Sequence, residues 1–172
     1  MTVLLVVGAF LGMEVAVYLS HRFVMHGPGM AVHASHHQRR PEPSWERNDL
    51  YPLAGSVLAM VGFGLGLNVA GLEALVPLAS GLTVYGACYF FVHDIYIHRR
   101  LPVFRAELAV CERLKAAHRI HHLWGGEPYG MLFPVVPAAL RARAEGVDYD
   151  PFPPARPRPR RDAPPVGTST TG

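Results

Sequence analysis

The stretch LYPLAGSVLAMVGFGLGLNVAGLEALVPLASGLTVYGACYFFVHDIYIH, residues 50–98, decides how the chain folds. Its first part, residues 50–72, carries no charge, and a second uncharged run, residues 74–92, follows after Glu73 alone. As a helix, the first part is about 34 Å long at about 1.5 Å per residue, and a hydrocarbon core is about 30 Å thick. Both runs are therefore predicted to be membrane-spanning helices joined as an antiparallel hairpin.

A third apolar stretch, residues 1–20, is interrupted only by the charge of Glu14. It has neither a positively charged start nor a small-residue cleavage site, so a retained span is predicted rather than a signal peptide. An ionisable residue at membrane depth is expected to be functional or hydrogen-bonded across helices. Buried helices of a soluble protein are the alternative, but three such stretches favour spans. Gly62 and Gly66 form a G-x-x-x-G pair, which predicts close approach of another helix.

The composition agrees with a membrane protein. Hydrophobic residues make up 50% of the 172-residue chain and charged residues 17%, whereas soluble domains average about 25% charged residues. The formal charge of +3 is small, and the arginines are not interleaved with aromatic residues, so no nucleic-acid partner is expected. The two cysteines form no motif, which sets aside a disulfide framework.

All ten histidines fall into a pattern that occurs twice. H-x4-H at residues 21–26 is followed by H-x2-H-H at 33–37, and the same motifs recur at 93–98 and 118–122. In H-x2-H-H, positions i, i+3 and i+4 lie on one face of a helix, so each motif is predicted to project into one site. In H-x4-H, positions i and i+5 are about 140° apart on a regular helix. The two histidines of each H-x4-H motif could therefore flank one metal site from two sides or bind two different metals. Alternatively, the helix is distorted so that both face one point.

Lysines and arginines orient the predicted bundle. Four arginines lie between the first two stretches, the turn around Glu73 has none, and the other twelve of the 16 Lys and Arg residues follow the third stretch. The positive-inside rule therefore places residues 21–49, and everything after about residue 93, in the cytoplasm. All four histidine motifs would then lie on the cytoplasmic side of an inner (plasma) membrane.

The rest of the chain is predicted to form a cytosolic cap. Residues 105–123 show helical spacing, and residues 129–140 are apolar but too short to span, which favours a re-entrant or interfacial segment. Residues 1–144 would form one all-α domain, an integral membrane helical bundle with three spans and a histidine-rich dimetal cap. Residues 145–172, rich in proline and arginine, are predicted to be a disordered tail whose removal leaves activity intact.

The ligand types indicate a pair of metal ions. Ten imidazoles exceed the three or four ligands of one zinc ion, and the chain lacks the Glu-x-x-His motif of soluble di-iron bundles. A histidine-dominated dimetal centre is expected, with iron as the redox-capable choice. Asp94 is a candidate acceptor for the ring nitrogen of a histidine that does not bind the metal, and would thereby orient the ring. Alternatively, Asp94 is only a charged residue at a helix end. A metal at the mouth of an apolar bundle suggests a lipid-like substrate.

The order of the four motifs resembles that of the fatty acid hydroxylase superfamily of membrane di-iron enzymes. The resemblance is strongest to the bacterial β-carotene hydroxylases of this superfamily, and it rests on HASHH followed by ERNDL, on HDIYIHRR and on AHRIHH. The resemblance covers about residues 8–135. It implies hydroxylation of the β-ionone rings of β-carotene at carbon 3, through β-cryptoxanthin to zeaxanthin, with O₂ as co-substrate. It also implies that two irons are bound by His21, His26, His33, His36, His37, His93, His98, His118, His121 and His122.

The same resemblance implies a carotenoid substrate taken from the lipid phase and electrons delivered from NAD(P)H by a ferredoxin-type carrier, as the sequence contains no G-x-G-x-x-G fingerprint. Two alternatives stay open. A hydroxylase or desaturase of the same superfamily would act on a fatty acyl chain or a sterol. A non-catalytic metal-binding or transport membrane protein is the remoter alternative, because transporters place ionisable groups at the midplane on several helices and here only Glu14 lies that deep.

Overall fold

The computed structural model of the chain describes residues 1–38, 45–101, 103–104 and 106–152. Within these ranges all regular structure is helical, which confirms the all-α prediction. Two segments, η1 and η3, are π-helical, and η2 is a 3₁₀ turn. The elements in chain order are α1 (Thr2–Leu19), η1 (Ser20–Met25), α2 (Met30–His33), η2 (Arg47–Asp49), α3 (Leu50–Asn68), α4 (Leu75–Phe90), η3 (Phe91–Ile97), α5 (Ala109–Trp124) and α6 (Ala138–Glu145).

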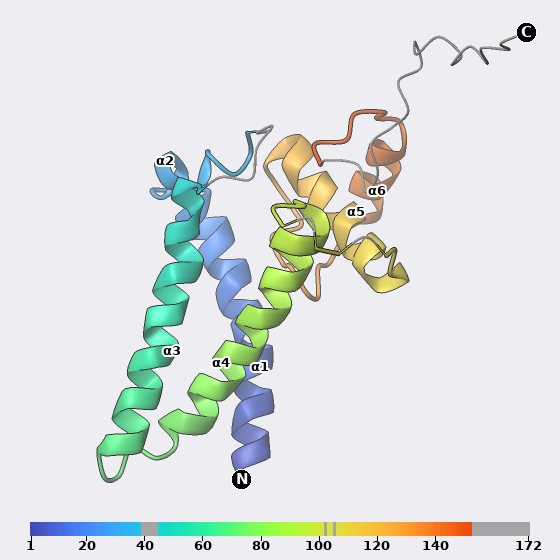
Figure 1. The fold of residues 1–172 in the computed structure, drawn as a ribbon. Helices are drawn as coiled ribbons and strands as arrows, with labels where there is room; N and C mark the ends of the chain where they lie inside the picture. The colour runs from blue at the N-terminus through green and yellow to red at the C-terminus, as the bar shows by residue number, and fades with distance from the viewer. Residues whose placement is uncertain (39–44, 102, 105, 153–172) are drawn as a thin grey trace, which may run out of the picture.

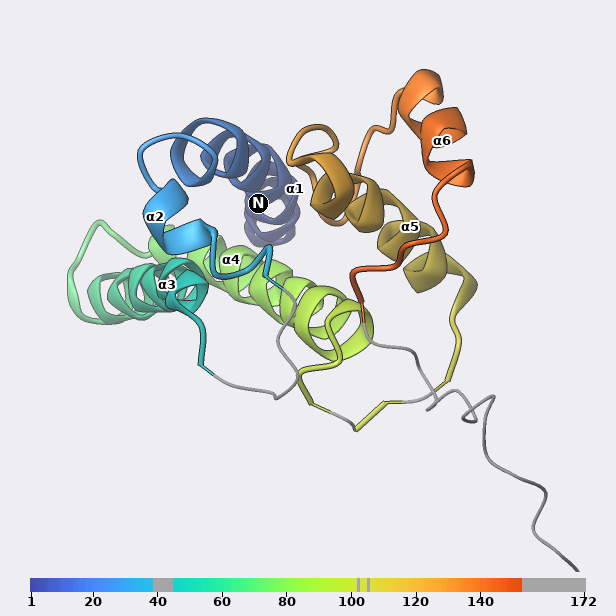
Figure 2. The same ribbon diagram turned by 90° about the horizontal axis from the view of Figure 1, so that it is seen from above.

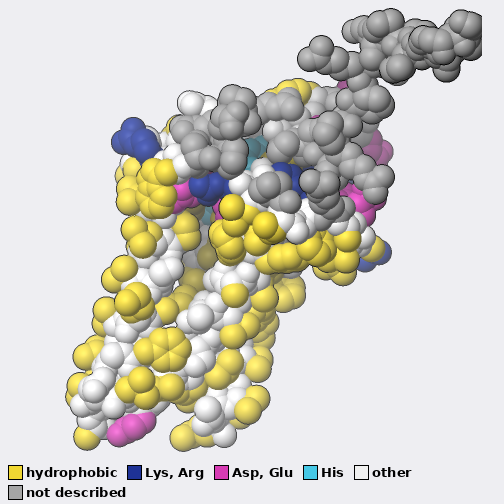
Figure 3. Space-filling view, in the orientation of Figure 1, with side chains coloured by type: hydrophobic (Ala, Val, Ile, Leu, Met, Phe, Trp, Pro, Cys, Tyr) yellow, Lys and Arg dark blue, Asp and Glu magenta, His cyan; other side chains and the backbone are white. Residues whose placement is uncertain are grey.

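Three continuous helices are long and apolar enough to cross a membrane, namely Thr2–Met25, Arg47–Asn68 and Leu75–Ile97. Their outer side chains are exposed, as lipid-facing residues must be, and Leu4 and Leu58 are 76% and 63% exposed. On the face shown in Figure 3, hydrophobic side chains predominate along the spanning helices, while most of the visible charged side chains lie at one end of the molecule. The three predicted spans are confirmed.

Helix α4 is the central helix and packs against both α1 and α3 (Figure 1). Small residues allow these close contacts. A Cβ atom added at Gly66 would lie 2.9 Å from the Val76 side chain, and one added at Gly62 would lie 3.1 Å from the Cβ of Ala79. On the other face of α4, a Cβ at Gly81 would lie 2.7 Å from the Cβ of Ala9 in α1. The close approach predicted from the G-x-x-x-G pair is confirmed.

The hairpin between α3 and α4 closes in a short turn at the end of the bundle that lies far from the histidines (Figure 1). Gly71 takes a positive φ of 86° there, and its N–H donates to the Glu73 carboxylate at 3.0 Å. Because α3 and α4 are antiparallel, the start of α3 and the end of α4 lie together at the opposite end. The end of α1 and helices α2 and α5 meet them there (Figure 2).

Helix α5 ends at Gly125, whose φ of 64° stops the helix. The chain then runs back along the bundle toward α1 and α4 before it returns to α6 (Figure 1). The N–H groups of Met131, Leu132 and Phe133 reach Glu14 in the span α1. We call residues 126–133 the re-entrant segment. This contact with a span favours the re-entrant structure of the two that were predicted for residues 129–140.

The buried core of the cap lies where η3, α5, the re-entrant segment and the last described residues meet, and it includes Tyr96, Ile97, Cys111, Met131 and Phe152. Phe152 is only 2% exposed. The sequence places the start of the tail at residue 145, but residues 146–152 continue from α6, and Phe152 packs on this core. The predicted tail from residue 153 onward lies outside the described residues.

Candidate metal centre

Both H-x4-H motifs lie in π-helical turns. The N–H of His26 donates to the carbonyl of His21 at 3.0 Å, and the N–H of His98 donates to that of His93 at 2.9 Å. A hydrogen bond between residues i and i+5 brings residue i+5 into line above residue i along the helix axis, so the two histidine rings of each motif face the same side. Of the possibilities that the sequence left open, helix distortion is the one observed.

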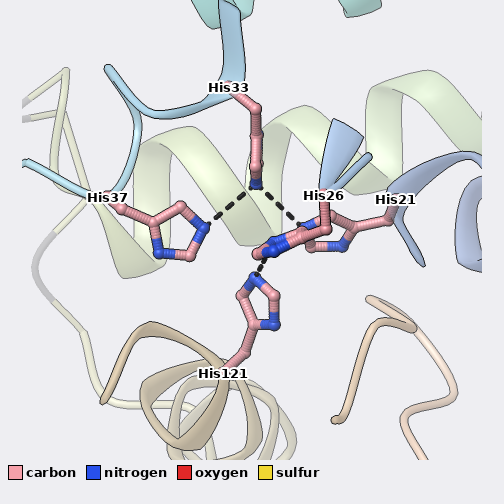
Figure 4. A group of neighbouring side chains, drawn as sticks. All are labelled: His21, His26, His33, His37 and His121. Atoms are coloured by element: carbon pink, nitrogen blue, oxygen red, sulfur yellow. Dashed lines mark hydrogen bonds between the residues drawn. The ribbon is translucent and has the colours of Figure 1, made fainter. Parts of the chain in front are cut away.

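Nine of the ten imidazoles form two neighbouring groups, within each of which the candidate ligand nitrogens lie within 4.8 Å of one another. The first group, shown in Figure 4 with its rings directed toward one another, consists of His21, His26, His33, His37 and His121. The second group consists of His36, His98, His118 and His122. His93 joins the second group, because its Nε2 atom lies 3.0 Å from Nε2 of His36.

The prediction that each H-x2-H-H motif projects into one site is wrong. His33 and His37 stay together, as do His118 and His122, but His36 joins the second group and His121 the first. On helix α5 the successive residues His121 and His122 point about 100° apart, so they diverge toward different groups. His36 lies beyond the end of α2 in a turn, where helical spacing no longer applies. The repeats thus exchange one histidine each.

Five rings are fixed through the nitrogen that faces away from the groups. In the first group, Nδ1–H of His21 donates to the Tyr129 carbonyl at 3.0 Å, His33 contacts Asn48 Oδ1 at 2.7 Å, and His121 donates to the Gly126 carbonyl at 2.6 Å. In the second group, His36 contacts Glu46 Oε2 at 3.3 Å and His93 contacts Asp94 Oδ2 at 3.2 Å. Metal-binding histidines are oriented by such acceptors.

The inward nitrogens fit a metal ion. Nε2 of His21 and Nε2 of His33 are 3.1 Å apart, and those of His36 and His93 are 3.0 Å apart. Since Nδ1 carries the proton in each of these four rings, two lone pairs face each other, which is unfavourable unless a cation lies between them. Ligands at right angles around an ion, each at the usual metal–imidazole distance of about 2.1 Å, are separated by about 3.0 Å.

Burial keeps the imidazoles neutral, the form that binds metals. Desolvation lowers the pKa of His33 to about 4 and that of His37 to about 3. The same cause, with repulsion from neighbouring histidines, holds the pKa values of His36, His118 and His122 well below the ordinary value. At neutral pH these rings are uncharged and can therefore serve as ligands.

Asp94, the predicted orienting residue, contacts His93 and also accepts a hydrogen bond from Arg100 at 2.8 Å. Arg100 also binds both carboxylate oxygens of Asp49, at 2.5 and 2.7 Å. The sequence reasoning gave Glu46, Asn48, Asp49 and Arg100 no role. The only signal for them was that ERNDL and HRR adjoin histidine motifs.

The chain matches the fatty acid hydroxylase family over residues 6–140. It belongs to this family. It is 40% identical over 132 residues to the β-carotene hydroxylase of a Paracoccus species, an alignment that covers 76% of this chain and 80% of the relative. It is 38% identical over 125 residues to the β-carotene hydroxylase of Pantoea ananas, covering 72% and 70%.

The chloroplastic β-carotene 3-hydroxylase of Haematococcus lacustris is 42% identical over 138 residues, which cover 76% of this chain but only 42% of that longer protein. No match was found among solved structures.

Proposed function

We propose that this member of the fatty acid hydroxylase family is a β-carotene hydroxylase that adds a hydroxyl group at carbon 3 of each β-ionone ring, giving β-cryptoxanthin and then zeaxanthin. Each step inserts one atom of O₂ into a C–H bond and reduces the other atom to water with two electrons and two protons. The observation that carries the proposal is the pair of buried, neutral histidine groups at one end of three apolar spans, in a chain so similar to bacterial β-carotene hydroxylases.

We further propose that each histidine group binds one iron ion, with His93 as a ligand in the second group and Asp94 as the residue that orients it. Two bound irons would supply the activation of O₂ needed to hydroxylate an unactivated C–H bond. The residues of the chain supply the rest. Nδ1 acceptors hold the rings in place, and burial of His33, His36 and His121, each at most 4% exposed, excludes bulk water from the ligands.

The carotenoid would reach the site from the lipid phase, because the histidines lie at the end of the apolar spans rather than in a separate soluble domain. The distribution of arginines and lysines supports a cytoplasmic location for the histidine groups at the inner membrane. There a ferredoxin-type carrier supplied by NAD(P)H would deliver the electrons.

Pigment analysis of a β-carotene-producing bacterial host that expresses the chain tests the proposal. The expected result is conversion to products with one and two added hydroxyl groups, resolved by chromatography and mass spectrometry, with a His36→Ala variant as the inactive control. Unchanged β-carotene, with the protein present in the membrane and iron bound, would contradict the proposal.

The alternative substrates are tested in the same cells. Hydroxylated or desaturated fatty acyl chains alongside unchanged carotenoid would favour the fatty acyl alternative of the same family. Metal accumulation without any oxidised lipid would favour the transport alternative.

A further inference from the structure

Glu14 lies in the middle of span α1 but is only 9% exposed. Its carboxylate accepts four hydrogen bonds, one from the Tyr85 hydroxyl of α4 at 2.5 Å and three from the successive backbone N–H groups of Met131, Leu132 and Phe133 at 2.9, 3.1 and 3.0 Å. The sequence reasoning saw no partner for this residue. In the fold, the carboxylate is the anchor of the re-entrant segment.

This anchor matters because the segment is not helical at these residues. Backbone N–H groups at membrane depth cost several kcal/mol each when unsatisfied, and irregular backbone is tolerated there only where protein groups bind it. Conversely, a carboxylate in a span is costly unless it is hydrogen-bonded. Glu14 and the three N–H groups satisfy each other, so neither is stable at this depth without the other.

The same segment carries the acceptors of two histidines of the first group. The Tyr129 carbonyl accepts from His21, and the Gly126 carbonyl accepts from His121. The Tyr129 ring also contacts the ring of His26, with centroids 5.3 Å apart. The acceptors of the second group, Glu46 and Asp94, lie outside the segment. The position of the segment is therefore coupled to the first group specifically.

A second set of hydrogen bonds fixes the segment at a point closer to the histidines. There the Glu127 carboxylate accepts from the Tyr18 hydroxyl at 2.7 Å and from the Arg22 guanidinium at 3.0 Å. The side chains of Arg22 and Glu127 are 45% and 31% exposed, and exposed ion pairs contribute little. The buried hydrogen bonds to Glu14 therefore contribute more to holding the segment in place than the hydrogen bonds to Glu127 do.

We propose that Glu14 is a positioning residue of the first metal site, acting through the re-entrant segment on His21 and His121. This rests on the proposed function in one respect, that the first group binds a metal ion. Replacing Glu14 by Gln removes one acceptor oxygen and sets an N–H₂ group against backbone donors. The segment is released, the two rings lose their orientation, and the first site loses its ion while the second keeps it.

The test measures bound iron in the purified full-length protein. The wild type is expected to hold about two ions per chain and Glu14→Gln about one. Tyr85→Phe is the matched control, because it removes a partner of the same carboxylate without touching the segment, and it is expected to hold about two. Hydrogen exchange of the peptide around residues 129–133 should become faster in Glu14→Gln and stay slow in Tyr85→Phe.

A double variant identifies which ion is lost. His118→Ala removes a ligand of the second group, so a chain that also carries Glu14→Gln has neither site intact and should hold almost no bound iron. If the double variant retains the one ion of the single variants, both act on the same site and the proposal is wrong. Retention of two ions by Glu14→Gln, or loss of both, also overturns it. A wild type without metal would instead overturn the proposed function.

Should Glu14→Gln not be recovered in the membrane, Gly130→Ala offers a second route. A Cβ atom there would lie 2.7 Å from Oε1 of Glu14 and displace the segment from its anchor. The same loss of about one ion is expected, and retention of both ions would overturn the proposal.

Discussion

The two histidine groups share one type of ligand but differ in what holds the ligands in place. The first group is oriented by neutral acceptors, namely the Tyr129 and Gly126 carbonyls and the Asn48 amide oxygen. The second is oriented by the carboxylates of Glu46 and Asp94. A carboxylate partner raises the basicity of an imidazole ligand, so the second group should hold a metal ion more tightly than the first.

The residues that orient the two histidine groups also come from different parts of the fold. The second group is framed by the spans themselves, because Arg100 after η3 joins Asp94 in η3 to Asp49 at the start of α3. The first group depends on the re-entrant segment, which is distant in sequence from His21. A motif repeated in the sequence has thus produced two histidine groups that differ in the charge of their acceptors and in their dependence on the rest of the fold.

The exchanged histidines give the largest expected effect. His36→Ala or His121→Ala removes a histidine that one repeat supplies to the other group, and with it a proposed metal ligand. Either change should abolish turnover, a loss well above the roughly 10–100-fold typical of orienting residues, and should lower bound metal while the protein still inserts. Carotenoid chromatography and metal analysis of membranes check this. Full activity in either variant would remove that residue from the ligand set.

The orienting acceptors give the next largest effect and test the difference between the groups directly. Glu46→Gln replaces a carboxylate of the second group by an amide and should weaken metal binding there by about 10–100-fold. Asn48→Asp makes the opposite change at His33, and the metal affinity of the first group should rise. Metal titration of the metal-free protein measures both affinities.

The metal-free Asn48→Asp protein serves as the internal check. Asn48 is 5% exposed, so an added carboxylate is buried without a cation and should lower the thermal unfolding temperature, which metal then restores. Equal changes in affinity for both variants, in the same direction, would contradict the proposed role of acceptor charge.

The sequence predicted what depends on composition and local order, and missed what depends on contacts between distant segments. The three apolar stretches and the gathering of all histidines at one end follow from hydropathy and from the hairpin at Glu73. The π-helical turns at His21 and His93 were one of several open alternatives, because i+5 spacing alone does not choose among them.

The exchange of His36 and His121 had no local signal. Helical spacing predicts one face for each H-x2-H-H motif, and only the placement of α5 beside the turn after α2 separates the members. The hydrogen bonds of Glu14 had no local signal either, since three of its four donors lie on an irregular segment more than a hundred residues later. Contacts of this kind arise from tertiary packing and leave no periodic pattern in the sequence.

A smaller effect is expected from pH on the metal-free protein. Burial lowers the pKa of His33 to about 4 and of His37 to about 3, whereas an unfolded histidine titrates near about 6.5. Between these values the unfolded chain binds more protons than the folded one, so stability is present above about pH 6.5 and is lost as the pH falls toward 4. Thermal unfolding at pH 7 and pH 5 measures the loss.

The His37→Gln variant refines that measurement, because it removes one of the shifted groups and should lessen the decrease between pH 7 and pH 5. A metal-free protein whose unfolding temperature does not change over this range would contradict the explanation by buried neutral histidines.

The smallest effect concerns Phe152, which covers the second group alone. Its ring lies 4.9, 5.6 and 5.2 Å from the rings of His98, His118 and His122. Arg119 of α5 fixes the segment that leads to Phe152, because it donates hydrogen bonds to the backbone carbonyls of Val147 and Tyr149. Truncation after residue 145 was expected from sequence to be silent, but the structure predicts that it exposes the second group to water. Activity should fall by roughly tenfold or less, below the effect of losing an orienting acceptor.

Truncation after residue 152 keeps Phe152 and should leave activity unchanged, while Phe152→Ala in the full chain should reproduce the loss seen on truncation after residue 145. Product formation in carotenoid-producing cells compares the three proteins. If the shorter truncation product is as active as the full chain, Phe152 does not protect the second group and the boundary of the working domain lies at residue 145 after all. If only the two proteins without Phe152 lose activity, the working domain extends to residue 152, and the second group, like the first, depends on a segment far from its own motif.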